Sequence, residues 1–308
     1  MSEHDRITTP FGATTTAAEV ASGVDLHGRR VVVTGGASGI GTETVRVLAA
    51  CGADVTIAAR DTDAGTRVAT AIAAEVGRPV GVAPLDLTDL ASVARFVAVW
   101  DGPLDILVNN AGLMACPETR TDRGWELQFA TNHYGHFALA TGLHSALSAA
   151  GDARVVSVSS LGHKHAAVVF DDIHFERRPY NKWVAYGQSK TANVLFAVEG
   201  ARRWAADGIT VNALHPGAIV TNLLRHLPAE DLDPSRGLRF SKNVEQGAAT
   251  SVFVATSPLL KTVSGRYFED CHEAGPLDPE GRSGVAPHAM DPEAAARLWD
   301  VSEAAVAS

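Results

Sequence analysis

A strand, a glycine-rich turn and a helix follow one another near the start of the chain, and this order strongly constrains the fold. The run Arg30 to Thr34 is rich in β-branched valine, which is typical of a buried parallel strand. Gly35, Gly39 and Gly41 follow in the spacing G-x-x-x-G-x-G, and an apolar helical pattern comes directly after them. Glycines let a backbone approach a pyrophosphate, and a helix N-terminus offers free N–H groups to it. The stretch therefore predicts a dinucleotide-binding βαβ unit.

The alternation of strands and helices continues along the chain. Further strands are predicted at 54–59, 80–85, 104–108, 154–158, 209–214 and 266–268, and further helices at 17–24, 89–100, 123–149, 184–206 and 293–306. This pattern predicts an α/β fold: one doubly wound (Rossmann) parallel sheet of about seven strands with helices on both faces. No shift in composition marks a second domain, so we expect a lead segment at 1–28 and a single domain at 29–308. Segments near 163–183 and 221–243 are expected to form substrate loops.

Composition and charge exclude several classes of protein. The formal net charge of −9 comes without a long block of lysine or arginine, so we expect no nucleic-acid partner. The N-terminus leads into no apolar segment of the signal-peptide type, and no apolar run approaches the length of a membrane span. Cys51, Cys116 and Cys271 lie far apart, with no cluster of His or Cys at ligand spacing. We therefore expect reduced thiols, no metal site, no membrane contact and a cytoplasmic location.

Tyr186 and Lys190 lie at the head of another long helical pattern. They are four residues apart, so on a helix they share one face. An ammonium near a phenol favours the phenolate, but a tyrosine titrates at about 10, and ionisation at neutral pH needs a shift of roughly 3 units. One lysine is not enough for this shift, and a second positive charge such as an oxidised nicotinamide ring would help. On spacing alone, a surface tyrosine and lysine that merely share a face is the simpler interpretation.

The end of the second predicted strand bears on the choice of dinucleotide. Arg60 lies about 20 residues beyond the glycines, where an acidic residue would bind the ribose 2′-OH of NAD and an arginine suits the 2′-phosphate of NADP. We therefore predict a preference for NADP(H). NAD(H) is the alternative, in which Arg60 is a solvated charge and Asp61 serves the ribose. After the third strand, Asp86 could cap the helix at 89–100, bind the adenine, or do both.

Several short motifs occur along the chain in a fixed order. They are Thr34-Gly35-x-x-x-Gly39-Ile40-Gly41, Asn109-Asn110-Ala111-Gly112, Asn132, Ser160, Tyr186-x-x-x-Lys190 and Pro216-Gly217. Together they closely resemble the classical short-chain dehydrogenase/reductase family, over roughly 28 to 270. A narrower similarity is to the retinol-dehydrogenase and WW-domain-oxidoreductase branch. It rests on four segments: Thr9 to Gly12, Thr131 to Phe137, Val155 to Ser160 and Gly265 to Phe268. We expect neither a WW domain nor the membrane anchor of many retinol dehydrogenases.

The resemblance implies a role for each matching residue. Tyr186 would be the general acid/base, Lys190 would lower its pKa and hold the nicotinamide ribose, and Ser160 rather than Ser159 would bind the substrate oxygen. Asn132 would hold Lys190 through a water molecule. The implied reaction is hydride exchange between a carbonyl and an alcohol, and we expect an apolar small-molecule substrate. The implied cofactor site contains Gly35, Ser38, Gly39, Ile40, Gly41, Arg60, Asp86, Leu87, Asn110, Ala111, Gly112, Tyr186, Lys190, Pro216, Gly217 and Thr221.

Two alternatives stay open at this point. The rival function is a non-catalytic dinucleotide sensor, although such proteins usually lose the Tyr or Lys that this chain keeps. The segment 163–183 makes the gap between Ser160 and Tyr186 unusually long, and it could line the substrate mouth or cover helices used for oligomer contacts. His163 and His165 within it are interpreted as loop residues, because no carboxylate or Cys stands at ligand spacing. A homodimer through the helices at 123–149 and 184–206 is an expectation by family analogy.

Overall fold

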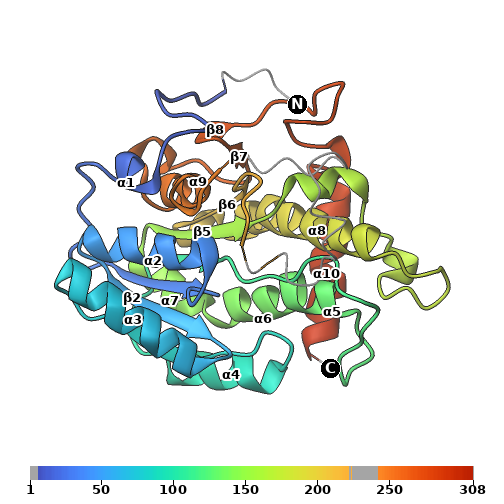
Figure 1. The fold of residues 1–308 in the computed structure, drawn as a ribbon. Coiled ribbons are helices and arrows are strands. Elements are labelled where there is room, and N and C mark those ends of the chain that lie inside the picture. Colours follow the sequence, from blue (N-terminus) through green and yellow to red (C-terminus); the bar gives the residue numbers. More distant parts are fainter. Residues whose placement is uncertain (1–5, 222, 224–241, 308) are drawn as a thin grey trace.

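An eight-stranded sheet forms the centre of the computed structural model, within the described residues 6–221, 223 and 242–307 (Figure 1). Its strand order is β3-β2-β1-β4-β5-β6-β7-β8, and the first seven strands are parallel. The order reverses between β1 and β4, and in open α/β sheets ligands bind beyond the carboxyl ends of the strands at such a point. The strands are β1 (Arg30–Thr34), β2 (Asp54–Ala59), β3 (Gly81–Pro84), β4 (Ile106–Asn109), β5 (Ala153–Val158), β6 (Ile209–His215), β7 (Tyr267–Glu269) and β8 (His272–Glu273).

Helices cover both faces of the sheet, because successive strand residues point to opposite sides. In β1, Val31 and Val33 pack into one apolar cluster and Val32 packs into the other. Figure 1 shows α2 and α9 on one side and α4 and α6 on the other, which confirms the predicted doubly wound α/β fold. The first face carries α2 (Gly39–Ala50), α3 (Thr62–Val76) and α9 (Val244–Thr256), and the second carries α4 (Leu90–Val99), α6 (Gly135–Gly142) and α8 (Lys182–Arg203).

The last strand differs from the prediction of a parallel sheet. β8 pairs antiparallel with β7 after a tight turn at Asp270 and Cys271, whose φ angles are 50° and 62°. A strand of two residues carries no alternating pattern, and this left-handed turn contains no glycine to signal it. The sequence therefore held no signal for this hairpin.

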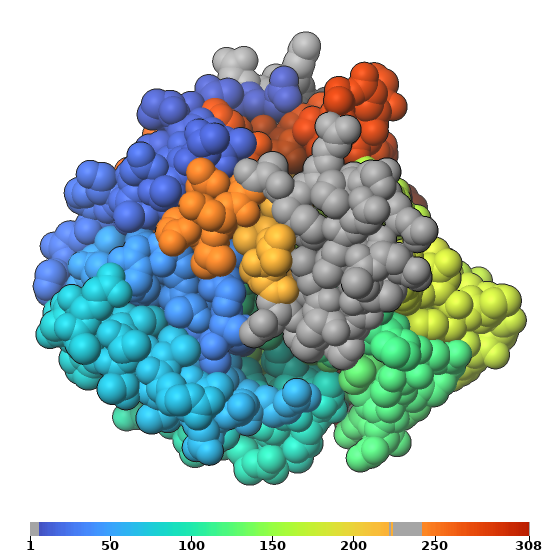
Figure 2. Space-filling view, in the orientation of Figure 1, coloured from blue at the N-terminus to red at the C-terminus, as the bar shows by residue number. Residues whose placement is uncertain are grey.

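Part of the lead segment lies along this edge of the sheet. The backbone N–H of Glu273 donates to the carbonyl oxygen of Ile7 (2.8 Å), and that of Thr9 donates to His272 Nδ1 (3.1 Å). α1 (Ala17–Val20), capped by the Thr16 side chain, then packs against α9. In Figure 2 this N-terminal segment, in blue, lies beside the orange surface of α9. A covered edge strand is shielded from pairing with another chain.

The helix predicted at 123–149 is broken into several pieces. It begins only at α5 (Leu127–Phe129), because the Glu126 carboxylate accepts hydrogen bonds from the first helical N–H groups. A π-helical turn (Ala130–Tyr134) follows, and then α6 and α7 (His144–Ala150). π turns are rare and frequently occur at functional sites, and this one carries Asn132.

The structure describes one of the two expected substrate loops in full. The segment 221–243 falls almost entirely outside the described residues. The segment 163–183 is tied to α8, because Gln188 accepts a hydrogen bond from Arg178 (2.8 Å) and donates one to the carbonyl oxygen of Ile173 (2.8 Å). A final helix, α10 (Pro292–Ala307), also packs against α8. Across the part of the chain that the structure describes, every helix is too short or too polar to cross a membrane.

Candidate active site

The glycine turn after β1 forms a cradle shaped by close backbone contacts. Gly35 and Gly39 have φ angles of 67° and 58°, which glycine adopts without strain. A Cβ atom on Gly41 would lie 2.5 Å from the carbonyl oxygen of Gly35, so no side chain fits there. Ser38 precedes α2 but makes no side-chain hydrogen bond to its first turn. The N–H groups of that turn therefore remain available to an anion such as a pyrophosphate.

The carboxyl end of β4 forms the other side of this cradle. The side chain of Asn110 donates to the carbonyl oxygen of Thr34 (2.7 Å). The backbone N–H groups of Asn110 and Ala111 both donate to the hydroxyl oxygen of Thr34 (2.9 Å each). These bonds hold the Asn109-to-Gly112 segment against the end of β1, where the predicted cofactor residues converge.

Arg60 and Asp61 follow the end of β2 and are both exposed. The Asp61 carboxylate accepts a hydrogen bond from the backbone N–H of Ala64 (2.9 Å) and so caps α3. One carboxylate oxygen of Asp61 is thereby used by the helix. Arg60 directly follows β2, at the strand end where a ribose substituent is expected.

Asp86 and Leu87 lie shortly after β3. The Asp86 carboxylate accepts hydrogen bonds from the backbone N–H (2.9 Å) and hydroxyl (2.6 Å) of Thr88. The expectation that Asp86 caps the next helix is wrong, because Asp89 precedes α4 directly and its carboxylate binds the first turn (2.9 Å). A Cβ atom on Gly135 would lie 2.2 Å from the carbonyl oxygen of Leu87, so Leu87 packs closely on the start of α6.

Pro216, Gly217 and Thr221 follow β6. Gly217 has a φ angle of 103°, and a Cβ atom there would lie 2.6 Å from Cδ of Lys242. A Cβ atom on Gly39 would lie 3.2 Å from Cβ of Thr221. The structure thus places Thr221 next to the glycine turn, and its contact with the cofactor stays a prediction.

Tyr186 and Ser160 meet where α8 begins. Burial raises the pKa of Tyr186, which is 5% exposed, to about 12, and a hydrogen bond with Ser160 offsets part of that rise. The Ser160 oxygen also accepts from the backbone N–H of Gly162 (3.0 Å). Adjacent Ser159 turns the other way and donates to the backbone carbonyl of Lys190 (2.7 Å). Ser160 is therefore the serine that faces Tyr186.

Lys190 lies one helical turn beyond Tyr186 and is 3% exposed. Its ammonium donates to the carbonyl oxygen of Val158 (2.9 Å) and lies 5.8 Å from the centre of the Tyr186 ring. Burial lowers the pKa of Lys190 to about 7. The pKa of Tyr186 thus moves upward here, against the direction expected from a neighbouring lysine, because burial disfavours both charged forms.

Asn132 connects the π turn to two neighbouring segments. Its Oδ1 accepts from the backbone N–H of Leu113 (2.8 Å), and its Nδ2 donates to the Leu113 carbonyl (3.0 Å) and to Ser189 Oγ (2.8 Å). A Cβ atom on Gly112 would lie 3.3 Å from Asn132 Oδ1 and 3.6 Å from Lys190 Nζ. The cofactor motif and the predicted catalytic residues therefore meet at Gly112.

Apolar side chains surround Tyr186. Met114 and Ala115 are buried against it, and Trp183 and Leu223 pack on the same cluster. This wall gives the site an apolar side next to the Tyr186 hydroxyl.

Two buried histidines at the site received no functional role from the sequence. His163, expected to be a loop residue, is fully buried: its Nδ1 bonds the carbonyl oxygen of Ser160 (2.7 Å), and Ala286 N–H donates to its Nε2 (3.0 Å). His136 bonds the backbone of Asn132 (3.0 Å). The i, i+4 spacing of Asn132 and His136 was a usable signal. His163 had no such signal in the sequence, because its second hydrogen-bond partner, Ala286, lies 123 residues away.

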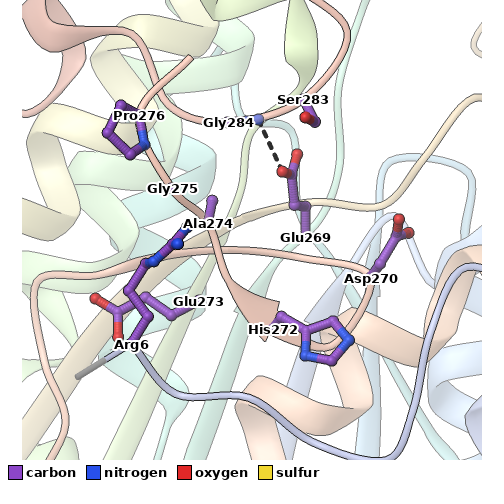
Figure 3. A pocket seen from close by; sticks show the side chains of 10 residues that line it. All are labelled: Arg6, Glu269, Asp270, His272, Glu273, Ala274, Gly275, Pro276, Ser283 and Gly284. Carbon is purple, nitrogen blue, oxygen red and sulfur yellow. Dashed lines mark hydrogen bonds between the residues drawn. The ribbon is translucent and has the colours of Figure 1, made fainter. Parts of the chain in front are cut away.

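A separate polar hollow of about 240 Å³ lies beside the turn between β7 and β8 (Figure 3). It contains Glu269, which accepts a hydrogen bond from the backbone N–H of Gly284 (2.7 Å). None of the predicted site residues lines it. Within the described residues, no group of three or more His, Cys, Asp or Glu side chains is placed to hold a metal ion.

The chain is similar to proteins of known family. The model of the short chain dehydrogenase family matches residues 29–232. A protein named Probable oxidoreductase, from Streptomyces antibioticus, is 58% identical over 292 residues, which cover 90% of this chain and 97% of that protein. Retinol dehydrogenase 14 of Homo sapiens is 40% identical over 302 residues, covering 91% of this chain and 87% of that protein.

Solved structures agree with these relatives. A structure from Mycobacterium paratuberculosis has a TM-score of 0.74 and 35% identity, and the match covers 94% of this chain and 97% of that one. A structure from Beutenbergia cavernae, with NADP bound at low occupancy, has a TM-score of 0.65 and 28% identity, covering 80% and 96%. The resemblance expected from the motifs, including the retinol-dehydrogenase branch, is confirmed.

Proposed function

The chain belongs to the short-chain dehydrogenase/reductase family, and from this premise we propose that it is an NADP(H)-dependent oxidoreductase that interconverts a carbonyl and an alcohol. One observation carries the proposal. Tyr186, Ser160 and Lys190 meet beside a glycine cradle whose helix N-terminus is open to an anion. The cradle and the residues after β4 would hold the dinucleotide, with Arg60 at its ribose. When bound, the nicotinamide supplies or accepts the hydride.

In the proposed mechanism Tyr186 exchanges a proton with the substrate oxygen. A phenol with a pKa of about 12 is fully protonated at neutral pH and can donate in the reductive direction. Ser160 would donate a hydrogen bond to the same oxygen and so stabilise the negative charge that develops on it. Lys190 would hold the ribose and, when protonated, favour the phenolate needed for alcohol oxidation.

The proposed substrate is an apolar aldehyde, ketone or alcohol. Support comes from the apolar wall of Met114, Trp183 and Leu223 around Tyr186. The name of the human relative, a retinol dehydrogenase, points in the same direction. A cytoplasmic setting is part of the proposal, and it is consistent with three cysteines that are not joined in disulfides.

The test is turnover with Tyr186→Phe run beside the wild type. NADPH oxidation would be followed with aldehydes and ketones, and NADP reduction with alcohols. We expect the variant to lose about 10²–10⁴-fold in kcat, because it removes the proton donor, while NADPH still binds. Tyr134→Phe makes the same chemical change in a buried tyrosine of another apolar cluster and should leave turnover intact.

Either of two results would count against the proposal. If Tyr186→Phe turns over substrate at the wild-type rate, another group is the acid/base. Tight NADPH binding with no turnover of any compound in the panel would favour the dinucleotide sensor instead.

A further inference from the structure

His136 bridges the cofactor cradle and the turn that carries Asn132. It is the second residue of α6, which directly follows the π turn, and it is 4% exposed. Its Nδ1 lies 3.0 Å from the backbone carbonyl oxygen of Asn132. Its Nε2 lies 2.9 Å from the hydroxyl oxygen of Thr34, the residue that leads into the glycine turn. One imidazole therefore contacts both parts of the site.

The partners of the ring determine which nitrogen carries the proton. A carbonyl oxygen only accepts, so Nδ1 of His136 bears the hydrogen and Nε2 must accept one from Thr34. The Thr34 oxygen already accepts from the N–H groups of Asn110 and Ala111 (2.9 Å each), which leaves its proton free to donate. The other acceptor in reach, the carbonyl of Val108, is farther away at 3.3 Å. Burial also lowers the pKa of His136 to about 4, so the ring is neutral at pH 7.

This arrangement forms one buried chain of hydrogen bonds. It runs from the backbone of Asn110 through Thr34 and His136 to the backbone of Asn132. The Asn132 side chain continues it to Leu113 and Ser189, beside the catalytic face of α8. A displacement of the Asn132 backbone would therefore be transmitted to groups around Lys190.

We propose that His136 is a positioning residue that fixes the Asn132 turn relative to the cofactor cradle. The proposal rests on the function proposed above, since it assigns Asn132 and the cradle to one active site. His136 touches neither substrate nor cofactor, and it acts through its two hydrogen bonds. Each bond should then affect a different property. The bond to Thr34 should affect NADPH binding in the cradle, and the bond to Asn132 should affect kcat.

Two amide substitutions separate the two bonds. The amide of asparagine reaches the place of Nδ1, so His136→Asn keeps a donor for Asn132 and loses the bond to Thr34. The longer glutamine reaches the place of Nε2, so His136→Gln keeps the bond to Thr34 and loses the one to Asn132. His136→Leu loses both.

The readouts are the dissociation constant of NADPH, from nicotinamide fluorescence, and kcat and KM in the reductive assay. We expect His136→Asn to weaken NADPH binding about tenfold with kcat near wild type, since the cradle loses one hydrogen bond. His136→Gln should lower kcat about 10–100-fold, the cost of a small displacement at a reacting centre, with NADPH binding near wild type. His136→Leu should show both losses.

His133 offers a matched control in the same π turn. It is 2% exposed, and its Nε2 bonds Ser302 of α10 (2.7 Å), on the side away from the cradle. His133→Asn, whose shorter amide does not reach the place of Nε2, loses the bond to Ser302. It should reduce thermal stability while changing kcat and the NADPH dissociation constant by less than about twofold.

The proposal is overturned if His136→Leu lowers thermal stability but leaves kcat, KM and NADPH binding as in the wild type. It is also overturned if His136→Asn and His136→Gln change the same property to the same extent. Failure of the proposed function is a distinct result, in which Tyr186→Phe turns over substrate at the wild-type rate. Measuring the NADPH dissociation constants of the His136 variants requires no turnover. These constants therefore test the role of the Thr34 bond in cofactor binding even if the proposed function fails.

Discussion

Arg60 and Asp61 are neighbours at the end of β2, but only Asp61 has a structural task there. Its carboxylate caps α3, whereas the exposed Arg60 lies where a 2′-phosphate is expected. We predict that Arg60→Ala weakens NADPH binding roughly 10–100-fold, the worth of a charge-assisted phosphate contact, and leaves NADH binding unchanged. Titrations of both dinucleotides against wild type and variant measure this selectivity.

Asp61→Asn is the control for this prediction. Asparagine caps a helix as well as aspartate, so α3 is preserved while the negative charge is removed. Both affinities should stay at wild-type values. Loss of NADH affinity in Asp61→Asn, with intact NADPH binding in Arg60→Ala, would instead support the NAD-preferring alternative.

For individual residues, the sequence predicted which ones lie together at the candidate site, but little of how they are held there. Tyr186, Ser160 and Asn132 were predictable because the motifs that carry them resemble those of the short-chain dehydrogenase/reductase family in type and in order. His163 was not, since its partners are backbone groups of distant segments. The upward pKa shift of Tyr186 was missed as well, because burial is a property of the folded chain and not of the spacing to Lys190.

Among the elements, α10 covers a face that the family analogy assigns to a dimer. The Trp299 ring stacks on Phe196 of α8 (centroids 5.7 Å apart) and meets Phe137 of α6 edge-on (5.0 Å). Arg203 at the end of α8 also pairs with Asp300. A dimer through this face of α6 and α8 would have to displace α10.

The buried aromatic contact, rather than the ion pair, should hold α10 in place. We predict that Trp299→Ala lowers the free energy of unfolding by about 3–5 kcal/mol, as expected for emptying a buried aromatic site. Asp300→Ala, one residue further on, should change it by less than about 1 kcal/mol, because the pair is exposed and screened. Urea unfolding of the two variants makes the comparison. Equal losses would contradict this account.

The elements that the sequence predicted best are the buried strands, whose valine-rich runs and following glycines are local signals. The segment 123–149 was predicted less well. Its apolar pattern suits one long helix, but the Glu126 cap and the π turn at Ala130–Tyr134 depend on contacts with other parts of the chain. A helical period cannot show where one extra residue enters a turn.

For the whole molecule, buried neutral histidines make stability depend on pH. Burial lowers the pKa of His133 to about 3 and the pKa values of His136 and His163 to about 4. Unfolding returns each to an ordinary pKa of about 6.5. Between pH 6.5 and 4 the unfolded chain therefore binds protons that the folded chain does not. Their contribution is fully present above pH 6.5 and is lost as the pH falls.

The expected result is a fall in the free energy of unfolding between pH 6.5 and 5. Each histidine contributes a slope of up to about 1.4 kcal/mol per pH unit. Urea unfolding at several pH values in this range measures the slope, and His133→Leu should reduce it by about one proton. A flat profile would mean that these histidines are charged in the folded state.

Ser159 and Ser160 have one further consequence, which concerns evolution. The first holds the backbone of α8 through Lys190, and the second faces Tyr186. Selection would act on Ser159 through the stability of the fold and on Ser160 through turnover. An alignment of relatives would then show two equally invariant serines, and conservation alone could not tell the anchor from the reactive group. The direction in which each hydroxyl points makes that distinction.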